Sequence, residues 1–294
     1  MKSIIKHTDL ITTKIAIENG FKWQIEKKSL LFSEFIEKKN YFINSIKISS
    51  SLDDLLKNKI CYEFLVAACS LSKKSLSNLD KLFVDDLIKQ TVDYSMLNNK
   101  NYLDNLIAKY FMICGDSLGG MMRNMIGSAA QEKLTNKIIY YLNINKISYS
   151  IKTNPKKLIN QISWEDKILV FNKKPKFINK SIDFILLKCD ESKKVNLENY
   201  KNYLACGELK GGIDPAGADE HWKTANFALQ RIQEAFSKNN WNVPSLFFIG
   251  SAIENSMAEE IYEQITNKQL SGAANLNIDI QLDEVIEMII KMQQ

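Results

Sequence analysis

Glu208 and Lys210 stand two residues apart in the stretch Gly207-Glu208-Leu209-Lys210, which is typical of a β-strand. Residues two apart on a strand point to the same side, so the acid and the amine can reach one site while Leu209 turns into the core. A carboxylate can hold a divalent cation, and an ammonium beside it can face a phosphate and its attacking water. The spacing therefore predicts metal-assisted chemistry on a phosphate.

Such a site needs a second acid, because magnesium usually takes one or two protein carboxylates together with water and phosphate oxygens. Asp183 is the candidate, since it opens the apolar, β-favouring run SIDFILLKCD. An Asp followed by Glu-x-Lys on a neighbouring strand resembles the pattern of the PD-(D/E)xK nuclease superfamily. Three common residues at loose spacing also occur by chance in unrelated proteins, so this pattern alone is a weak signal.

Longer blocks carry a more specific resemblance. Four stretches are similar, nearly word for word, to the AvaI/BsoBI family of type II restriction endonucleases: GDSLGGMMRNMIGSAAQEKLTNKII, GELKGGIDPAGADEHWKTANFALQRIQEAF, FFIGSAIENSMAEEIY and SGAANL. The blocks are spread over about the last two-thirds of the chain, and the likeness is much less clear before Phe111. The resemblance implies a homodimeric, magnesium-dependent enzyme that cuts both strands of a short palindromic site in double-stranded DNA.

His221 opens the helix that follows the loop after Lys210, and it is one of two histidines in the chain. A surface or capping histidine is the ordinary reading of such a residue. In the family that the chain resembles, the histidine of the DEHW block lies at the active site and is the proposed general base. An unperturbed imidazole accepts a proton near neutral pH, which suits that role.

The resemblance and the residues together give an expected mechanism. Asp183, Glu208 and the backbone carbonyl of Leu209 are expected to coordinate Mg²⁺, which polarises the scissile phosphate. Lys210 adds positive charge beside the same oxygens, and either His221 or Lys210 removes the water proton. Cleavage leaves a 5′-phosphate and a 3′-hydroxyl.

Asp214 is the candidate for base recognition, in the loop GGIDPAGAD after the catalytic strand. A carboxylate accepts a hydrogen bond from the amino group of cytosine and is repelled by phosphates, so it belongs at DNA only where it contacts a base. An Asp that fixes its own turn is an equal alternative. Members of the family recognise the G·C-rich palindrome CYCGRG and leave 5′ overhangs, which makes this or a related site the expected target.

The first part of the chain, residues 1–110, is expected to be mainly helical, and residues 111–294 are expected to form the catalytic domain. Apolar residues recur at three- and four-residue spacing in SLLFSEFIEKKNYFINSI, SLDDLLKNKICYEFLVAACSL and LDKLFVDDLIKQ, and the first two begin with a Ser able to cap a helix. Lysines such as Lys81 interleave these helices. Each one either lies on a solvated face or contacts a phosphate.

A long helix is predicted to begin at Asp116 or Ser117. Gly119 and Gly120 would weaken its first turn and let another backbone approach. Arg123 lies about one turn further on, where it could help the positive end of the helix dipole to hold a DNA phosphate. Close helix packing with a surface Arg is the competing reading.

From Lys146 onward the spacing of apolar residues changes from the three- and four-residue spacing of helices to patterns that favour β-strands. Short β-favouring runs are KISYSIKTN, DKILVFNKKP, SIDFILLKCD, NYLACGELKGG and SLFFIGSAI, and predicted helices cover ADEHWKTANFALQRIQEAFSKNN, ENSMAEEIYEQITN and QLDEVIEMIIKM. The predicted fold class is therefore α/β: a PD-(D/E)xK nuclease-like mixed sheet flanked by helices, with an added N-terminal helical region.

Composition agrees with a DNA-acting cytoplasmic enzyme and does not decide it. The chain has 294 residues, 45% of them hydrophobic, and a net charge of +5, a mild excess shared by many proteins that bind no nucleic acid. Five cysteines without paired spacing indicate reduced thiols. No stretch is typical of a signal peptide or a membrane span, so no membrane partner is expected.

Other classes of function remain as alternatives to restriction. A structure-specific or repair nuclease of the same superfamily would use the same metal site but cut without sequence preference. A non-catalytic DNA-binding protein would have no need for an intact Asp183, Glu208, Lys210 and His221. Two strands to be cut favour a two-fold symmetric homodimer, and the resemblance implies a cognate DNA methyltransferase as a functional partner.

Overall fold

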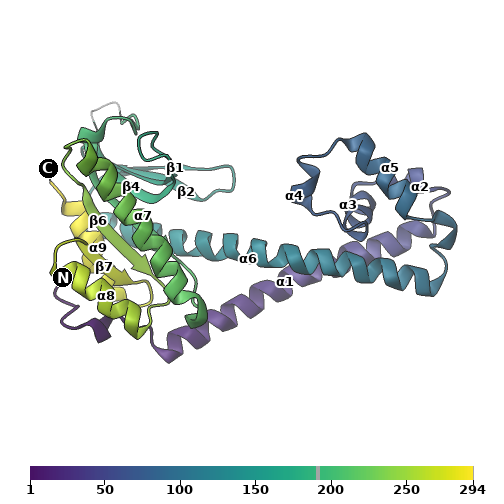
Figure 1. The fold of residues 1–294 in the computed structure, drawn as a ribbon, viewed down its shortest axis with the longest axis horizontal. Coiled ribbons are helices and arrows are strands. Elements are labelled where there is room, and N and C mark those ends of the chain that lie inside the picture. The colour runs from purple at the N-terminus through teal and green to yellow at the C-terminus, as the bar shows by residue number, and fades with distance from the viewer. Residues whose placement is uncertain (190–192, 294) are drawn as a thin grey trace. The chain divides into compact units, whose positions relative to one another are not determined.

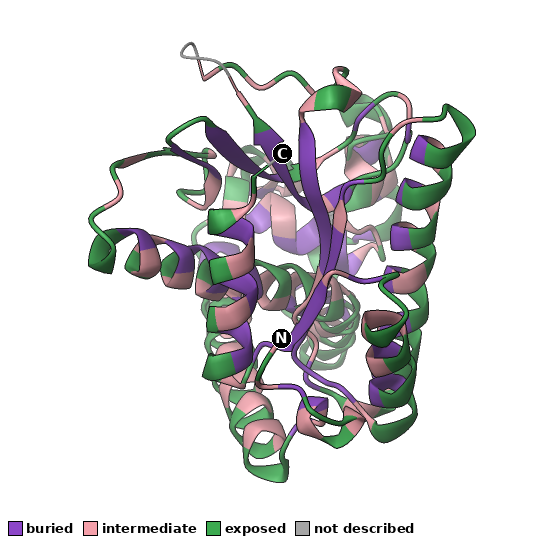
Figure 2. Ribbon diagram, turned by 90° about the vertical axis from the view of Figure 1, so that its left-hand side faces the viewer, coloured by how far each residue is buried: buried purple, intermediate pink, exposed green. Residues whose placement is uncertain are grey.

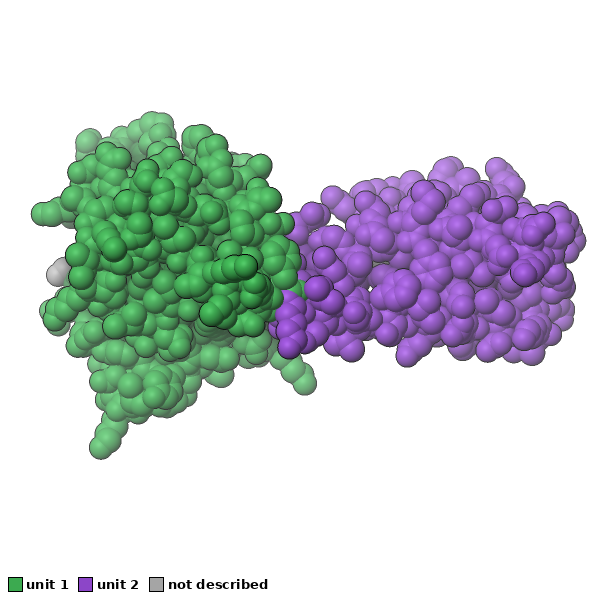
Figure 3. Space-filling view, turned by 90° about the horizontal axis from the view of Figure 1, so that it is seen from below, with its two compact units in different colours: residues 1–21, 125–294 green, residues 22–124 purple. Residues whose placement is uncertain are grey.

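A computed structural model of the chain describes residues 1–189 and 193–293. The chain forms two compact units, one made of residues 1–21 with 125–294 and the other of residues 22–124 (Figure 3). The first unit holds the sheet, and the second is helical throughout its secondary structure (Figure 1). The predicted fold class, a mixed sheet with flanking helices and an N-terminal helical region, is confirmed.

Two long helices, α1 and α6, run from one unit into the other along the chain. The helices up to the sheet are η1 (His7–Leu10), α1 (Lys14–Ile46), α2 (Leu52–Lys57), α3 (Lys59–Ala68), α4 (Lys73–Leu76), α5 (Lys81–Thr91), η2 (Tyr94–Met96) and α6 (Lys100–Ile144). Within the helical unit, Phe64 of α3 stacks on Phe42 of α1 and on Tyr110 of α6, with ring centroids 3.9 and 4.4 Å apart. Burial of these rings holds the unit together.

Local capping explains where several of these helices begin. The Ser51 hydroxyl accepts the Asp54 amide and starts α2, as predicted. Asn58 accepts two amides of α3 and so divides the predicted helix over 51–71 into α2 and α3. Ser29 was the other expected cap, and this expectation is wrong: it lies inside α1, where its hydroxyl donates to the Ile25 carbonyl.

The predicted start of a helix at Asp116 or Ser117 is also wrong. Both residues lie in the interior of α6, which begins at Lys100. Gly119 and Gly120 are likewise mid-helix. Since the backbone amides there are engaged within the helix, Arg123 has no free helix N-terminus beside it. Any contact between Arg123 and a phosphate would depend on its exposed guanidinium alone.

The sheet has seven strands in sequence order. These are β1 (Tyr149–Thr153), β2 (Ile159–Trp164), β3 (Lys167–Lys173), β4 (Ile182–Lys188), β5 (Tyr203–Lys210), β6 (Ser245–Gly250) and β7 (Gly272–Asn275). β1 to β5 pair antiparallel, whereas β5, β6 and β7 are parallel. Parallel neighbours need crossover connections, and helices supply them here.

Helices cover both faces of the sheet. The remaining helical segments are η3 (Tyr200–Asn202), η4 (Pro215–Gly217), α7 (Ala218–Lys238), α8 (Asn255–Thr266) and α9 (Asp279–Lys291). One core lies between the sheet and helices α7 and α8, and the other between the sheet, α9 and the C-terminal part of α6. Figure 2 shows the strands buried along most of their length, with the outer sides of the helices exposed.

Helix α7 shows why its sequence folds in this way. Trp222, Ala225, Leu229, Ile232 and Phe236 recur at three- and four-residue spacing, and all five are buried against the sheet, as predicted. Deep burial of two large aromatic rings in this stripe anchors the helix that follows the candidate site. Among the described residues, no helix is both long and apolar enough to cross a membrane.

Candidate active site

Strands β4 and β5 bring the predicted acids and amine to one end of the sheet. The two strands are antiparallel, and Phe184 pairs with Gly207. Asp183 and Glu208 each lie one residue beyond that pair, and Lys210 is the last residue of β5. The start of one strand and the end of the other thus meet at the same edge.

A compact set of hydrogen bonds joins these side chains. Lys210 Nζ donates to Asp183 Oδ2 over 3.0 Å and to Glu208 Oε2 over 2.6 Å. The Leu209 backbone amide donates to the same Asp183 oxygen over 2.8 Å. The ammonium therefore bridges the two carboxylates, and the backbone of β5 orients the Asp183 carboxylate directly.

Strand alternation decides which face of the sheet carries the site. Cys206 packs in the core beneath α7, whereas Leu209 packs against the core on the α9 side. Glu208 and Lys210 share the direction of Cys206, because residues two apart on a strand point the same way. The acid and the amine accordingly lie on the sheet face that α7 covers.

Gly207 allows the strands to pack closely beside the acids. A Cβ at this position would overlap the ring of Phe184, the residue that follows Asp183. Phe184 is fully buried, so its ring has little room to yield. The glycine therefore leaves the space that the Phe184 ring occupies next to the site.

Burial gives Glu208 unusual electrostatics. The residue is 3% exposed, and its Oε1 has no hydrogen-bond partner. Burial, followed by the nearby charge of Asp183, raises the pKa of Glu208 to about 7, although Lys210 opposes the shift. Burial alone would lower the pKa of Lys210, but the charges of Glu208 and Asp183 outweigh it and raise that pKa. Lys210 therefore stays protonated at neutral pH.

These residues fit a hard divalent cation. A buried carboxylate oxygen without a partner is costly, and a cation would satisfy the Oε1 atom of Glu208. Among the residues the structure describes, no group of three or more His, Cys, Asp or Glu side chains forms a metal cluster. Two carboxylates with a backbone carbonyl, water and phosphate oxygens match the ligand preference of Mg²⁺ better than that of zinc.

His221 lies in the first turn of α7, packed on the loop that leaves β5. A Cβ at Gly212 would overlap the imidazole, with Nδ1 only 2.8 Å away. The ring therefore rests on the backbone two residues beyond Lys210, and it is half-buried there. The histidine thus lies against the loop at Gly212, and its role at the active site stays a prediction.

The other predicted site residues are exposed and make no described hydrogen bond to this cluster. Asp214 is exposed, and its Oδ1 accepts the Ala216 amide over 3.0 Å, so it does fix its own turn. Arg123 is exposed on α6. Lys81 is the first residue of α5, and its Nζ lies 6.0 Å from the centroid of the Tyr62 ring. All three are accessible to a large ligand, and none of them contacts the carboxylates in the described hydrogen-bond set.

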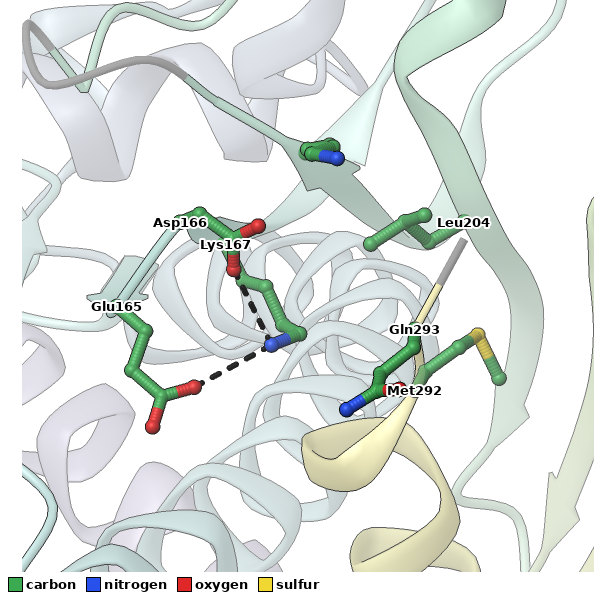
Figure 4. Close-up of a pocket in the computed structure, with 7 residues that line it drawn as sticks. Glu165, Asp166, Lys167, Leu204, Met292 and Gln293 are labelled. Atoms are coloured by element: carbon green, nitrogen blue, oxygen red, sulfur yellow. Dashed lines mark hydrogen bonds and ion pairs between the residues drawn. The ribbon is translucent and has the colours of Figure 1, made fainter.

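A separate pocket of about 380 Å³ lies away from this cluster (Figure 4). It includes Lys188, which ends β4 at the opposite end from Asp183. Its Lys167 ammonium is paired with Glu165 over 3.3 Å and with Asp166 over 3.2 Å. Because local carboxylates already neutralise this cation, the pocket lacks the arrangement of acids and amine that phosphate chemistry needs.

Sequence reasoning missed a buried polar network next to the site. The Thr12 hydroxyl donates to the Ser251 carbonyl over 2.9 Å and accepts from the Asn275 side chain over 2.7 Å. The Ser251 amide in turn donates to the Lys210 carbonyl over 2.8 Å. The signal in the sequence is that Ser251 and Asn275 fall in two of the blocks that resemble the AvaI/BsoBI family, FFIGSAIENSMAEEIY and SGAANL.

Comparison with known proteins agrees with this geometry. Residues 1–292 match the family model described as restriction endonuclease BsobI. The chain belongs to the BsoBI restriction endonuclease family. It is a type II restriction enzyme, a site-specific deoxyribonuclease. The blocks that suggested this family in the sequence contain Glu208, Lys210 and His221, whereas Asp183 and Thr12 lie outside them.

Individual relatives are similar over nearly their whole length. Type II restriction enzyme BsoBI of Geobacillus stearothermophilus is 35% identical, with 97% of this chain and 95% of that protein covered. Type II restriction enzyme AvaI of a Nostoc species is 34% identical over 93% of both chains, as is AvaI of Anabaena variabilis. The similarity therefore includes the N-terminal region, where the sequence blocks alone were less clear.

Proposed function

We propose that this BsoBI-family enzyme hydrolyses both strands of a short palindromic DNA site, CYCGRG or a related sequence, with Mg²⁺ as its cofactor. The observation that carries the proposal is the convergence of Asp183, Glu208 and Lys210 at one strand end, with a buried Glu208 oxygen that lacks a partner. Divalent metal use is typical of type II restriction enzymes, and the two-carboxylate donor set favours magnesium.

In this proposal, Asp183, Glu208 and the Leu209 carbonyl hold the cation, which supplies charge to stabilise the phosphorane-like transition state when it is bound. Lys210 keeps its proton because of its two carboxylate neighbours, and it orients the attacking water and the scissile phosphate. Its position between the acids favours an electrostatic role over that of a base.

His221 is then the better candidate for the general base. The imidazole accepts a proton from water as the water oxygen bonds to phosphorus. The bond from phosphorus to the 3′ oxygen breaks, and that oxygen takes up a proton. The products are a 5′-phosphate and a 3′-hydroxyl. The imidazole lies against Gly212 and is only half-buried, so it is partly accessible to solvent.

DNA contacts are assigned to exposed groups away from the carboxylates. Lys81 and Arg123 are proposed to contact phosphates, and Asp214 to accept a hydrogen bond from a cytosine amino group. Asp214 uses Oδ1 to cap its turn, which holds the carboxylate in a fixed position on the loop. We assign hydrolysis to the predicted catalytic domain, residues 111–294, which also carries Arg123 and Asp214, and further DNA contacts with a dimer surface to residues 1–110.

The biological setting follows from the activity. A homodimer places one active site on each strand of a palindrome. A cognate DNA methyltransferase protects the same site in the host genome, as a functional partner and not a physical one. Such an enzyme acts in the cytoplasm, where foreign DNA arrives.

Digestion of phage DNA with magnesium, beside the Glu208→Ala variant, tests the proposal. Discrete bands that the variant loses support restriction, and sequencing of their ends gives the site and the cut position. Smearing by the wild type would instead indicate a structure-specific or general nuclease. Absence of cutting by both proteins would indicate a DNA-binding protein without hydrolytic activity.

A further inference from the structure

Helix α1 and the loop after the catalytic strand fit together at Gly20. A Cβ at Gly20 would lie 2.5 Å from Cγ1, 2.8 Å from Cγ2 and 2.9 Å from Cβ of Ile213. Ile213 is 5% exposed, so its side chain is enclosed as well as close. Gly20 thus forms a notch in α1 that Ile213 fills, and both residues belong to the unit that holds the sheet.

The three residues that follow Lys210 each contact a different helix. A Cβ at Gly211 would lie 2.8 Å from the Ile126 carbonyl oxygen of α6, and Gly212 lies under the imidazole of His221 in α7. Ile213 completes the set on α1. Gly211 and Gly212 have no side chains that could restrict the backbone of this loop. The Ile213 side chain is therefore the group that holds the loop in place beneath His221.

The start of α1 is itself fixed to the catalytic strand. Thr12 Oγ1 donates to the Ser251 carbonyl over 2.9 Å and accepts the Ile253 amide over 2.9 Å. The Ser251 amide donates to the Lys210 carbonyl over 2.8 Å. α1 begins two residues after Thr12, at Lys14. One buried network therefore ties Lys210 to the base of the helix that carries the notch.

We propose that Gly20 and Ile213 are positioning residues for His221 in phosphodiester hydrolysis. The contact between them fixes the height of Gly212, and the Gly212 backbone supports the imidazole. A displacement of Ile213 would move Gly212 and so shift the His221 imidazole relative to the two carboxylates and Lys210. Misplacement of a reacting group by about 1 Å can cost a large part of its catalytic effect. The inference rests on the proposed role of His221 as the general base.

Two variants displace the anchor in opposite ways. Gly20→Ala fills the notch and pushes Ile213 out, whereas Ile213→Ala leaves the notch empty and removes the two atoms nearest to the new Cβ. The matched control is Asn19→Ala, which changes an exposed residue of the same helical turn. Each protein is assayed by single-turnover cleavage of a plasmid carrying the mapped site, with DNA affinity measured without magnesium.

We expect Gly20→Ala and Ile213→Ala each to slow single-turnover cleavage about 10-fold or more while DNA affinity stays within about 2-fold. The double variant Gly20→Ala/Ile213→Ala should recover part of the loss in Gly20→Ala, because the two closest atoms are then removed and only the Cβ of residue 213, 2.9 Å away, remains near the added methyl. Asn19→Ala should cut at the wild-type rate. Equal rates for all four proteins would overturn the inference.

The decisive comparison repeats Gly20→Ala in a His221→Ala background. If the notch acts through His221, the second substitution costs little further rate, since effects of residues that act as a unit are not additive. If Gly20→Ala slows cleavage by the same factor in both backgrounds, the inference is overturned and the proposed function stands. A wild-type enzyme that cuts no site would instead overturn the proposed function, and the inference with it. Thermal unfolding of each variant distinguishes a misfolded protein from a misplaced His221. Misfolding would lower the rate in both backgrounds and would also weaken DNA binding.

Discussion

Lys210 Nζ donates to Asp183 Oδ2 over 3.0 Å, and the same oxygen accepts the Leu209 amide. The Asp183 carboxylate is therefore oriented from two directions by the strand that carries its partner acid. This arrangement is well suited to a site that must present oxygens to a cation in a fixed geometry.

The first prediction concerns the two acids. We expect Asp183→Ala and Glu208→Ala each to reduce DNA cleavage by about 10³-fold or more, because each removes a proposed cation ligand and electrostatic support for the transition state. Affinity for DNA should change little, since it depends mainly on phosphate contacts. Cleavage assays and gel-shift titrations measure the two quantities. Equal loss of cleavage and binding would contradict the assignment.

The second prediction concerns stability and pH in the absence of metal. Burial and the Asp183 charge raise the pKa of Glu208 from its ordinary value of 4.5 to about 7. Between these values the folded state binds more protons than the unfolded state, so stability falls as pH rises. The stabilising contribution is complete below the unfolded pKa and is lost as pH rises through the folded pKa.

With a chelator present, the melting temperature should therefore fall more steeply in the wild type than in Glu208→Gln between about pH 5 and about pH 7. Lys210 stays protonated over this range and does not mask the trend. Scanning calorimetry at several pH values checks it. Parallel curves for the two proteins would show that Glu208 titrates normally.

The third prediction contrasts two glycines. Gly207→Ala should destabilise the protein by about 1–3 kcal/mol, because the new methyl overlaps the enclosed Phe184 ring. Gly115→Ala should stabilise it by about 0.5–1 kcal/mol, because Gly115 is inside α6 and has nothing within 4 Å of its Cβ position. Denaturant unfolding measures both, and a shared sign would contradict the packing argument.

The fourth prediction concerns phosphate contacts. Lys81→Ala and Arg123→Ala should each weaken DNA binding, with similar effects on cognate and random sequences. Each should reduce the slope of log affinity against log salt concentration by about 1, because one fewer counterion is released. Binding titrations over a range of salt test this. An unchanged slope for either variant would show that the residue lies on a solvated helix face and contacts no phosphate.

The fifth prediction separates the two roles of Asp214. Asp214→Asn keeps a side-chain oxygen that can cap the Ala216 amide, so the melting temperature should stay the same. The amide lacks the charge of the carboxylate and also presents donors, which changes the fit to a cytosine amino group. Sequencing of cleaved ends should show relaxed or altered preference at one base pair. An unaltered cleavage site would show that Asp214 stabilises its own turn and contacts no base.

Much of the fold follows from periodicity in the sequence, and the misses have physical causes. β2 was not predicted because the adjacent polar residues Asn160 and Gln161 interrupt its apolar pattern, although Gln161 and Ser163 prove to be buried. β7 consists of small residues with weak strand propensity. The start of α6 was placed too late because Asp116 and Ser117 are residues typical of a helix N-cap, although here both lie in the interior of the helix.

The site shows a similar division between what sequence can and cannot predict. Two-residue alternation is enough to put Glu208 and Lys210 on one face. The pairing of β4 with β5, which brings in Asp183, depends on the topology of the whole sheet and entered only through a family resemblance. The contact of Gly20 with Ile213 joins distant segments, and no local pattern indicates it.

The course of the chain through its two units has a practical consequence for engineering. The polypeptide leaves the sheet-bearing unit after residue 21 and returns at residue 125, so the helical unit is an insertion and not a leading module. Deleting the N-terminus to obtain a minimal nuclease would discard Thr12 and Gly20 along with the helices. A graft onto another protein would have to keep residues 1–21 and rejoin them to α6, and a replacement of the inserted unit would remove Lys81 and Arg123, the two proposed phosphate contacts.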